Sequence, residues 1–163
     1  MIFVSVGMSE LQFNRLISKM DEIAPELDDE VIMQIGSADY ECKNTKNFRF
    51  ADDEKMAGYY DQCDLLVCHA GVGTIINGLK NNIPIVVVPR RAELGEVDTN
   101  HQFMIADELV KMGRGISVEN VDNLKEAISK AKEMKFPPYT RSTELSDFLD
   151  ETLAEIDERK KKR

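Results

Sequence analysis

The chain has 163 residues, enough for one domain with a sizeable hydrophobic core. Its 30 acidic residues against 21 basic ones give a net charge of −9, which argues against nucleic acid as a partner. No apolar run approaches the ~20 residues of a membrane span, and the three cysteines form no CxxC pair. We therefore expect a soluble cytoplasmic protein with free thiols that meets a membrane only peripherally, through a partner.

Apolar runs and apolar residues at helical spacing alternate along the chain. In order they predict a strand at 1–6, a helix within 8–23, strands at 31–35 and 48–50, a helix at 53–62, a strand at 65–68, a helix at 75–81, a strand at 84–88, a helix at 101–112, a strand at 116–118, and helices at 121–131 and 142–159. Asp52 or Asp53 can cap the second helix, and Pro137 and Pro138 precede the last one.

Strands that are apolar throughout and alternate with helices are typical of a parallel sheet covered on both faces. The sequence therefore predicts a doubly wound, Rossmann-like α/β fold with a mostly parallel six-stranded sheet. In such sheets ligands bind beyond the carboxyl ends of the strands. Small or polar residues follow four of those ends, at 7–9, 36–37, 69–74 and 90–102. This convergence favours a binding site on one rim.

The most informative stretch is residues 63–78, CDLLVCHAGVGTIING, in which a buried strand runs through a glycine turn into a helix. The free N–H groups and the positive dipole end of that helix suit a phosphate. Gly71 and Gly73 would let the backbone approach an anion without a Cβ in the way. Thr74 could add a hydroxyl and His69 a ring N–H.

Two well-known phosphate-binding patterns do not fit this turn. A dinucleotide fingerprint would need a glycine where Ile76 stands. A P-loop would need a lysine where Leu79 stands, and Lys80 comes one place late. From the glycines alone, a tight strand-to-helix turn without a ligand is an equally good interpretation.

Several motifs together carry a family resemblance. The segments VSVG near the start, QIG, CHAGVGT, IPIVVVPRRAELGE and HQ before a helix resemble the donor-binding, C-terminal half of GT-B glycosyltransferases. They are most similar to the small catalytic subunit of two-component N-acetylglucosaminyltransferases of asparagine-linked glycosylation and exopolysaccharide synthesis, and to the C-terminal domain of glycosyltransferase family 28. The resemblance covers roughly residues 1–121.

The resemblance implies a UDP-sugar substrate, in particular UDP-N-acetylglucosamine, with no metal and no separate cofactor. It puts Gly71, Gly73 and Thr74 on the nucleotide diphosphate and His69 beside them. Residues 1–136 would bind this donor, and residues 137–163 would add a C-terminal helix and a basic tail to the same single domain.

Other positions follow from the same resemblance. Gln102, which forms the HQ pair with His101, would reach the hydroxyls of the donor sugar. Arg90, Glu96 and Asp98 would line the loop before that pair.

This chain departs from its relatives at two of these positions. Gly7 would end a second loop facing the donor, with Ser9 substituting for the Thr or Ser that relatives carry where this chain has Met8. Asn77 stands where relatives commonly carry a Glu that accepts hydrogen bonds from both ribose hydroxyls. An amide pairs with a diol without the strength that a charge adds. The alternative is that Asn77 is only a solvated helix residue.

The function implied is the donor-binding catalytic subunit of a two-component inverting glycosyltransferase. A membrane-anchored partner subunit would hold the lipid-linked or glycan acceptor. Inversion needs a general base, and His69 is a candidate by its pKa range, although its place favours a phosphate contact over a catalytic or a purely structural role. The alternative function is a non-catalytic nucleotide-sugar-binding or regulatory subunit. An epimerase-like domain is less favoured, because the chain lacks a second domain to close the cleft.

Overall fold

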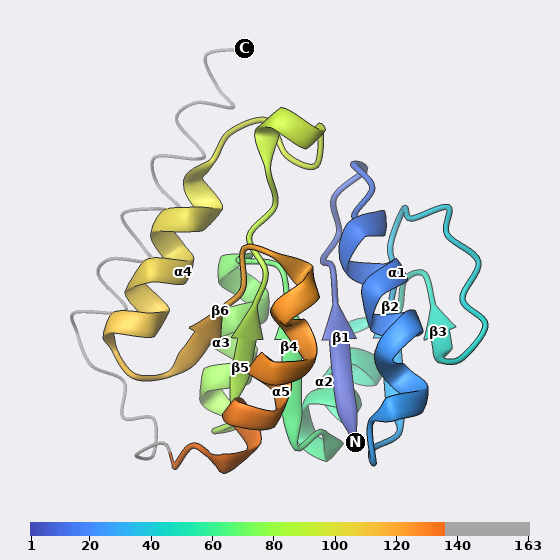
Figure 1. The fold of residues 1–163 in the computed structure, drawn as a ribbon. Coiled ribbons are helices and arrows are strands. Elements are labelled where there is room, and N and C mark those ends of the chain that lie inside the picture. The colour runs from blue at the N-terminus through green and yellow to red at the C-terminus, as the bar shows by residue number, and fades with distance from the viewer. Residues whose placement is uncertain (136–163) are drawn as a thin grey trace.

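Six parallel strands form one sheet, and helices cover both of its faces (Figure 1). The structure is a computed structural model that describes residues 1–135; the predicted helix at 142–159 and the basic tail lie outside the described residues. The strands are β1 (Ile2–Ser5), β2 (Val31–Gln34), β3 (Lys46–Phe48), β4 (Leu65–Cys68), β5 (Ile85–Val87) and β6 (Gly115–Ser117). Their order is β3-β2-β1-β4-β5-β6, and every pair is parallel, which confirms the doubly wound, Rossmann-like prediction.

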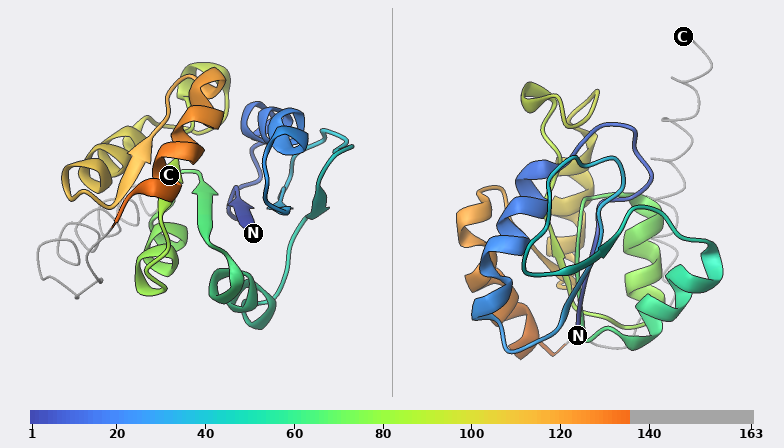
Figure 2. Two further views of the ribbon diagram at one scale, coloured as in Figure 1. Left: turned by 60° about the horizontal axis from the view of Figure 1, so that its bottom comes forward. Right: turned by 90° about the vertical axis from the view of Figure 1, so that its right-hand side faces the viewer.

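Five α-helices and three short 3-10 turns accompany the strands within the described part of the chain. The helices are α1 (Asn14–Ile23), α2 (Asp53–Gln62), α3 (Val72–Lys80), α4 (His101–Lys111) and α5 (Leu124–Glu133), and the turns are η1 (Ala24–Glu26), η2 (Ala92–Leu94) and η3 (Val121–Asn123). Helices α1 and α5 cover one face of the sheet, and α2, α3 and α4 cover the other (Figure 2). None of the helices in residues 1–135 is long and apolar enough to span a membrane.

Burial on both faces explains why the strands are apolar throughout. In β4, Leu65 and Val67 join the core under α1 and α5, whereas Leu66 and Cys68 join the core under α2, α3 and α4. All four side chains are fully buried. Neither face leaves a position for a polar residue, so the period-2 alternation of a half-exposed strand is missing.

Most predicted elements lie where the periodicity places them, and β3 is the exception. The strand was predicted at 48–50 but runs over Lys46–Phe48, so the prediction was wrong by two residues. Lys46 and Asn47 are exposed on this edge of the sheet, and an exposed edge strand needs no apolar residues to mark it. Phe50 lies beyond the strand and is 50% exposed.

The strand order reverses between β1 and β4, and this positions the site. The chain leaves β1 for α1 on one face of the sheet, and it leaves β4 for α3 on the other. The two connections therefore diverge, and the rim between them is not covered by either helix. In doubly wound sheets this switch point is the usual place for a ligand.

Candidate functional site

A pocket of about 360 Å³ opens at the carboxyl ends of β1, β2 and β4. Ser5 of β1 lies in register between Gln34 of β2 and Cys68 of β4, so the loops after these strands start side by side. Of the residues predicted for the site, six line this pocket: Gly7, His69, Gly71, Gly73, Thr74 and Asn77. The fold thus gathers two glycine turns that are more than 60 residues apart in the sequence.

The amino end of α3 contributes unpaired hydrogen-bond donors to the pocket. Gly71 precedes the helix and supplies no side-chain cap. Within residues 1–135, the N–H groups of Val72, Gly73 and Thr74 have no hydrogen-bond acceptor. A Cβ added to Gly73 would meet nothing within 4 Å, so there is open space beside these donors. The arrangement suits an anion with several acceptor oxygens.

The imidazole of His69 lies between two glycines. A Cβ at Gly7 would lie 2.5 Å from Cε1 of the ring, and a Cβ at Gly71 would overlap with Nε2. Gly7 also has a φ of 77°, which glycine adopts without strain. Glycine is therefore needed at positions 7 and 71 because a side chain at either would collide with the His69 ring. The spacing of residues around each glycine in the sequence does not show this.

The surroundings of His69 favour its neutral form. Burial lowers the pKa of the imidazole to about 4, the positive charge of Arg90 acts in the same direction, and a hydrogen bond to the Ser5 carbonyl offsets them only in part. Nδ1 lies 3.4 Å from that carbonyl, which can only accept, so Nδ1 carries the proton. The ring N–H that we expected at a phosphate is thus directed to Ser5, and Nε2 presents a lone pair.

Polar side chains that the sequence analysis missed form the floor of the pocket. Ser5 and Gln34 are 1% and 2% exposed, and the Ser5 hydroxyl donates to Oε1 of Gln34 over 3.0 Å. Tyr60 of α2 is 4% exposed, and burial raises the pKa of its phenol. The sequence could have indicated Ser5 and Gln34 as pocket residues, since each is a polar residue at the carboxyl end of an otherwise apolar strand. It could not have indicated Tyr60, because an aromatic residue in an amphipathic helix is ordinary.

No lysine or arginine lines this pocket among the residues described. Phe50, Ala51 and Met56 form an apolar wall, and Asp53 brings a carboxylate to its edge. The charge of an anionic ligand would therefore be met by the backbone N–H groups and dipole of α3 rather than by cationic side chains.

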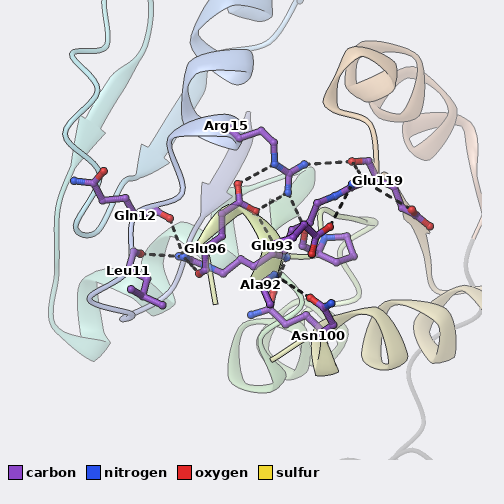
Figure 3. Close-up of polar contacts among 12 residues, drawn as sticks. Leu11, Gln12, Arg15, Ala92, Glu93, Glu96, Asn100 and Glu119 are labelled. Atoms are coloured by element: carbon purple, nitrogen blue, oxygen red, sulfur yellow. Dashed lines mark hydrogen bonds and ion pairs between the residues drawn. The ribbon is translucent and has the colours of Figure 1, made fainter. Parts of the chain in front are cut away.

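Arg90 lies in a separate network on the same rim. Figure 3 shows this network between the loop after β1, at Leu11 and Gln12, and the loop after β5, at Glu96. The Arg90 side chain is 1% exposed and lies over the ring of Phe13, at 4.7 Å from the centroid. It donates hydrogen bonds of 2.9–3.3 Å to the backbone carbonyls of Val6, Leu11, Gln12 and Glu96. Burial lowers the pKa of the guanidinium to about 10, which leaves it charged at neutral pH.

Glu96 completes this network. Its carboxylate accepts two hydrogen bonds from the Arg15 guanidinium, at 2.9 and 2.8 Å, and one from the Arg91 backbone N–H at 2.9 Å. Arg15 also reaches the carbonyls of Pro89 and Glu119 (Figure 3). Arg90 and Glu96 do not line the pocket, and their side chains are bonded within the protein, so the contacts to a donor that the family resemblance implies for them stay predictions.

The remaining predicted residues also lie outside the lining of this pocket. The Ser9 hydroxyl accepts the Leu11 N–H over 3.1 Å. Oε1 of Gln102 accepts the backbone N–H of Arg90 over 3.0 Å, and His101 begins α4 next to it. Asp98 is exposed in the preceding loop. Among residues 1–135 no three His, Cys, Asp or Glu residues gather in a way that could hold a metal ion.

Solved structures share this fold. An NMR solution structure of ALG13 superposes with a TM-score of 0.60 at 22% identity, covering 89% of this chain and 91% of that one. The crystal structure of the kitacinnamycin glycosyltransferase gives a TM-score of 0.65 at 23% identity, covering 82% of this chain and 34% of that one. At such identities the likeness concerns the fold alone.

Sequence comparison is more specific. The UDP-N-acetylglucosamine transferase subunit ALG13 of Candida albicans is 29% identical over 120 residues, which is 66% of this chain and 38% of that protein. The protein of the same name from Debaryomyces hansenii is 33% identical over 87 residues, 51% of this chain and 38% of that protein. The matched part thus spans well under half the length of either relative.

The family match confirms the resemblance that the motifs carried. It runs over residues 1–159 and so takes in both the glycine turns of the pocket and the Arg90 network. With nearly the whole sequence matched, this chain belongs to the glycosyltransferase family 28 C-terminal domain family.

Proposed function

We propose that this protein binds UDP-N-acetylglucosamine and is the donor-binding catalytic subunit of a two-component inverting glycosyltransferase. Its membership of glycosyltransferase family 28 and its similarity to proteins named UDP-N-acetylglucosamine transferase subunits support this class of donor and reaction. A second, membrane-anchored subunit would hold a lipid-linked or glycan acceptor and bring this chain to the cytoplasmic face of the membrane.

The observation that carries the proposal is the amino end of α3 in the pocket. Three consecutive N–H groups, at Val72, Gly73 and Thr74, lack partners among the described residues, and a Cβ added to Gly73 would meet nothing within 4 Å. A diphosphate offers several acceptor oxygens and a negative charge, which these N–H groups and the helix dipole would stabilise. The Thr74 hydroxyl also lines the pocket and could add a further donor.

The same groups suit the transfer step. The acceptor hydroxyl attacks C1 of the sugar with inversion, its proton goes to a general base, and the bond from C1 to the diphosphate oxygen breaks. Negative charge grows on the leaving UDP as that bond breaks, and donors already held in place stabilise it without reorganisation. The N–H groups of α3 are such donors, because the helix holds them fixed.

The general base would come from the partner subunit. A base is most effective when its pKa lies near the working pH. With a pKa of about 4, His69 is a weak proton acceptor at neutral pH, which makes a contact to the ligand a better role for it than proton abstraction. This low basicity also keeps open the alternative of a non-catalytic nucleotide-sugar-binding or regulatory subunit.

Two measurements test the proposal. UDP and UDP-N-acetylglucosamine, added to the labelled protein, should shift the amide NMR signals of Gly71, Gly73 and Thr74 before those of distant residues. Shifts confined to distant residues, or none at millimolar concentration, would overturn the assignment of the site. Reconstitution with a candidate anchored partner and a lipid-linked acceptor should then give sugar transfer that the chain alone does not catalyse. Binding without turnover in the complex would favour the regulatory subunit, and partner-independent transfer would exclude the two-component mechanism.

A further inference from the structure

The side-chain amide of Gln34, at the end of β2, uses all of its hydrogen-bonding capacity inside the protein. Its Oε1 accepts from the Ser5 hydroxyl and from the Gly7 N–H, each over 3.0 Å. Its Nε2 donates to the carbonyls of Gly7 at 2.8 Å and Arg49 at 3.0 Å. An amide has two acceptor sites and two donor hydrogens, so all four are satisfied. With 2% of its surface exposed, Gln34 has nothing left with which to bind a ligand.

Two of these bonds hold the Gly7 turn. Gln34 binds both the N–H and the carbonyl of Gly7, and within residues 1–135 no other group makes a hydrogen bond to either. The turn lies against the ring of His69, since a Cβ on Gly7 would collide with that ring. A shift of the turn would therefore change the space in which His69 stands.

The bond to Arg49 reaches a second segment that lines the pocket. The Arg49 carbonyl directly precedes Phe50 and Ala51 of the lining, and it also accepts the Gly36 N–H over 3.1 Å. One planar amide thus connects the turn after β1 to the segment after β3. Because Nε2 donates to both carbonyls over 3.0 Å or less, the amide fixes how the Gly7 carbonyl lies relative to the Arg49 carbonyl.

We infer that Gln34 is a positioning residue of this pocket, whose amide sets the Gly7 turn, the orientation of His69 and the position of that turn relative to the segment after β3. It acts through these groups and not by touching the ligand. The expected effect of Gln34 on nucleotide binding rests on the proposed function. Its effect on the orientation of His69 does not, because that effect is measured in the ligand-free protein.

The first experiment replaces the amide with an apolar side chain of similar length, Gln34→Met. Met33→Ala is the matched control, because Met33 is fully buried in the same strand but does not line the pocket. We expect Gln34→Met to move the His69 Cε1–H NMR signal in the free protein and to weaken UDP binding about tenfold or more, since two bonds to the turn are lost. Met33→Ala should lower the melting temperature while leaving both readouts unchanged. An unchanged His69 signal and affinity in Gln34→Met, or equal losses in Met33→Ala, would overturn the inference.

The second experiment, Gln34→Glu, distinguishes hydrogen bonding from packing and also serves if Gln34→Met does not fold. A carboxylate can accept from Ser5 and Gly7 but cannot donate to the carbonyls of Gly7 and Arg49. A protonated acid can donate one such bond, and burial favours protonation. The affinity of Gln34→Glu for UDP-N-acetylglucosamine, whose diphosphate does not titrate in this range, should therefore recover several-fold relative to wild type between about pH 7.5 and 5.5. A ratio that does not change with pH would contradict the inference.

The two experiments separate this inference from the proposed function. If the wild-type protein binds no UDP, the proposed function fails, and the His69 signal in Gln34→Met and Gln34→Glu still decides whether Gln34 positions the ring. If wild type binds UDP and the Gln34 variants bind it equally well with an unmoved His69 signal, the inference fails and the proposed function stands.

Discussion

At the start of α3, three backbone N–H groups have no acceptor among the described residues, and two of them belong to residues that line the pocket. At the loops after β1 and β5, by contrast, the Arg90 guanidinium bonds four backbone carbonyls. The first region contains no lysine or arginine in its lining, and the second holds three arginines and a buried glutamate. Both lie on the same rim of the sheet.

The contrast separates groups that can receive a ligand from groups that hold the loops. A charged side chain at the rim suggests a ligand contact in the sequence, yet a buried charge must be paired or hydrogen-bonded to be tolerated. The Arg90 guanidinium donates to four backbone carbonyls, and the Glu96 carboxylate pairs with Arg15. Backbone N–H groups at the start of a helix can be recognised in the sequence only by the glycine turn before them. The start of α3, which has fewer charged side chains, is therefore the better candidate for binding an anionic ligand.

The largest effect is expected in the Arg90 network. Arg90→Met removes the donors of four backbone carbonyls, so we expect a loss of about 3 kcal/mol or more in the free energy of unfolding, measured by urea denaturation. The affinity for UDP should fall less than about tenfold, because Arg90 does not line the pocket.

Arg91→Met is the matched control for this change. The neighbouring arginine is 30% exposed and bonds the carbonyl of Glu119 at the surface, so its loss should cost about 1 kcal/mol or less. A stable Arg90→Met protein that no longer binds UDP would reverse the assignment and make Arg90 a ligand contact, as its place in the family motif suggests.

In the pocket, Gly73→Val should abolish binding without unfolding the protein. Nothing lies within 4 Å of the added Cβ, so the fold should accept it, while the branched side chain occupies the space beside the free N–H groups. We expect at least about 100-fold weaker UDP binding by calorimetry and a change in unfolding free energy below about 1 kcal/mol. Gly58→Val, in α2 and away from the pocket lining, should leave the affinity unchanged. Tight UDP binding by Gly73→Val would place the anion elsewhere.

A smaller effect concerns the acid stability of the pocket region. The pKa of His69 is about 4 in the folded protein, below its ordinary value of 6.5, so the unfolded chain takes up a proton first as the pH falls. The stabilisation by neutral His69 is complete above about pH 6.5 and decreases toward pH 4, by roughly 2 kcal/mol at pH 5. His69→Gln should remove this dependence from urea midpoints measured at pH 7 and 5, and His101→Gln should retain it. An unchanged pH slope in His69→Gln would show that the imidazole is solvated.

The smallest effect separates the sugar from the nucleotide. Gln102→Ala should weaken UDP-N-acetylglucosamine binding by about 1 kcal/mol, roughly fivefold, while UDP binding hardly changes, if the family motif places Gln102 at the sugar hydroxyls. Oε1 of Gln102 accepts the Arg90 N–H, so a small loss of stability should accompany the change. Asp107→Ala on the exposed face of α4 is the control. Equal losses for UDP and the UDP-sugar would restrict Gln102 to supporting Arg90.

Much of the fold could be predicted because its signals are local. The apolar run of β4, the glycine turn and the amphipathic pattern of α3 are neighbours in the sequence, and the strand Leu65–Cys68 lies where its residues predicted. Asp52 caps α2 by accepting the Lys55 N–H over 2.9 Å, as expected from its place before the helix. The strand β3 was misplaced because its exposed residues Lys46 and Asn47 have no periodicity to detect.

The sequence by itself determined the alternation of strands and helices, the two-faced burial of β4 and the glycine turn with an uncapped helix start, since each depends on residues within one or two turns of chain. Only the tertiary structure decided that His69 lies between Gly7 and Gly71, that Gln34 connects the Gly7 turn to the segment after β3, and that Arg90 hydrogen-bonds the loops after β1 and β5. Those contacts join residues as far as 84 positions apart, and their partners are mostly backbone atoms, which every residue has. Local spacing therefore identifies candidate groups, whereas packing across the sheet determines which of them remain free to bind a ligand.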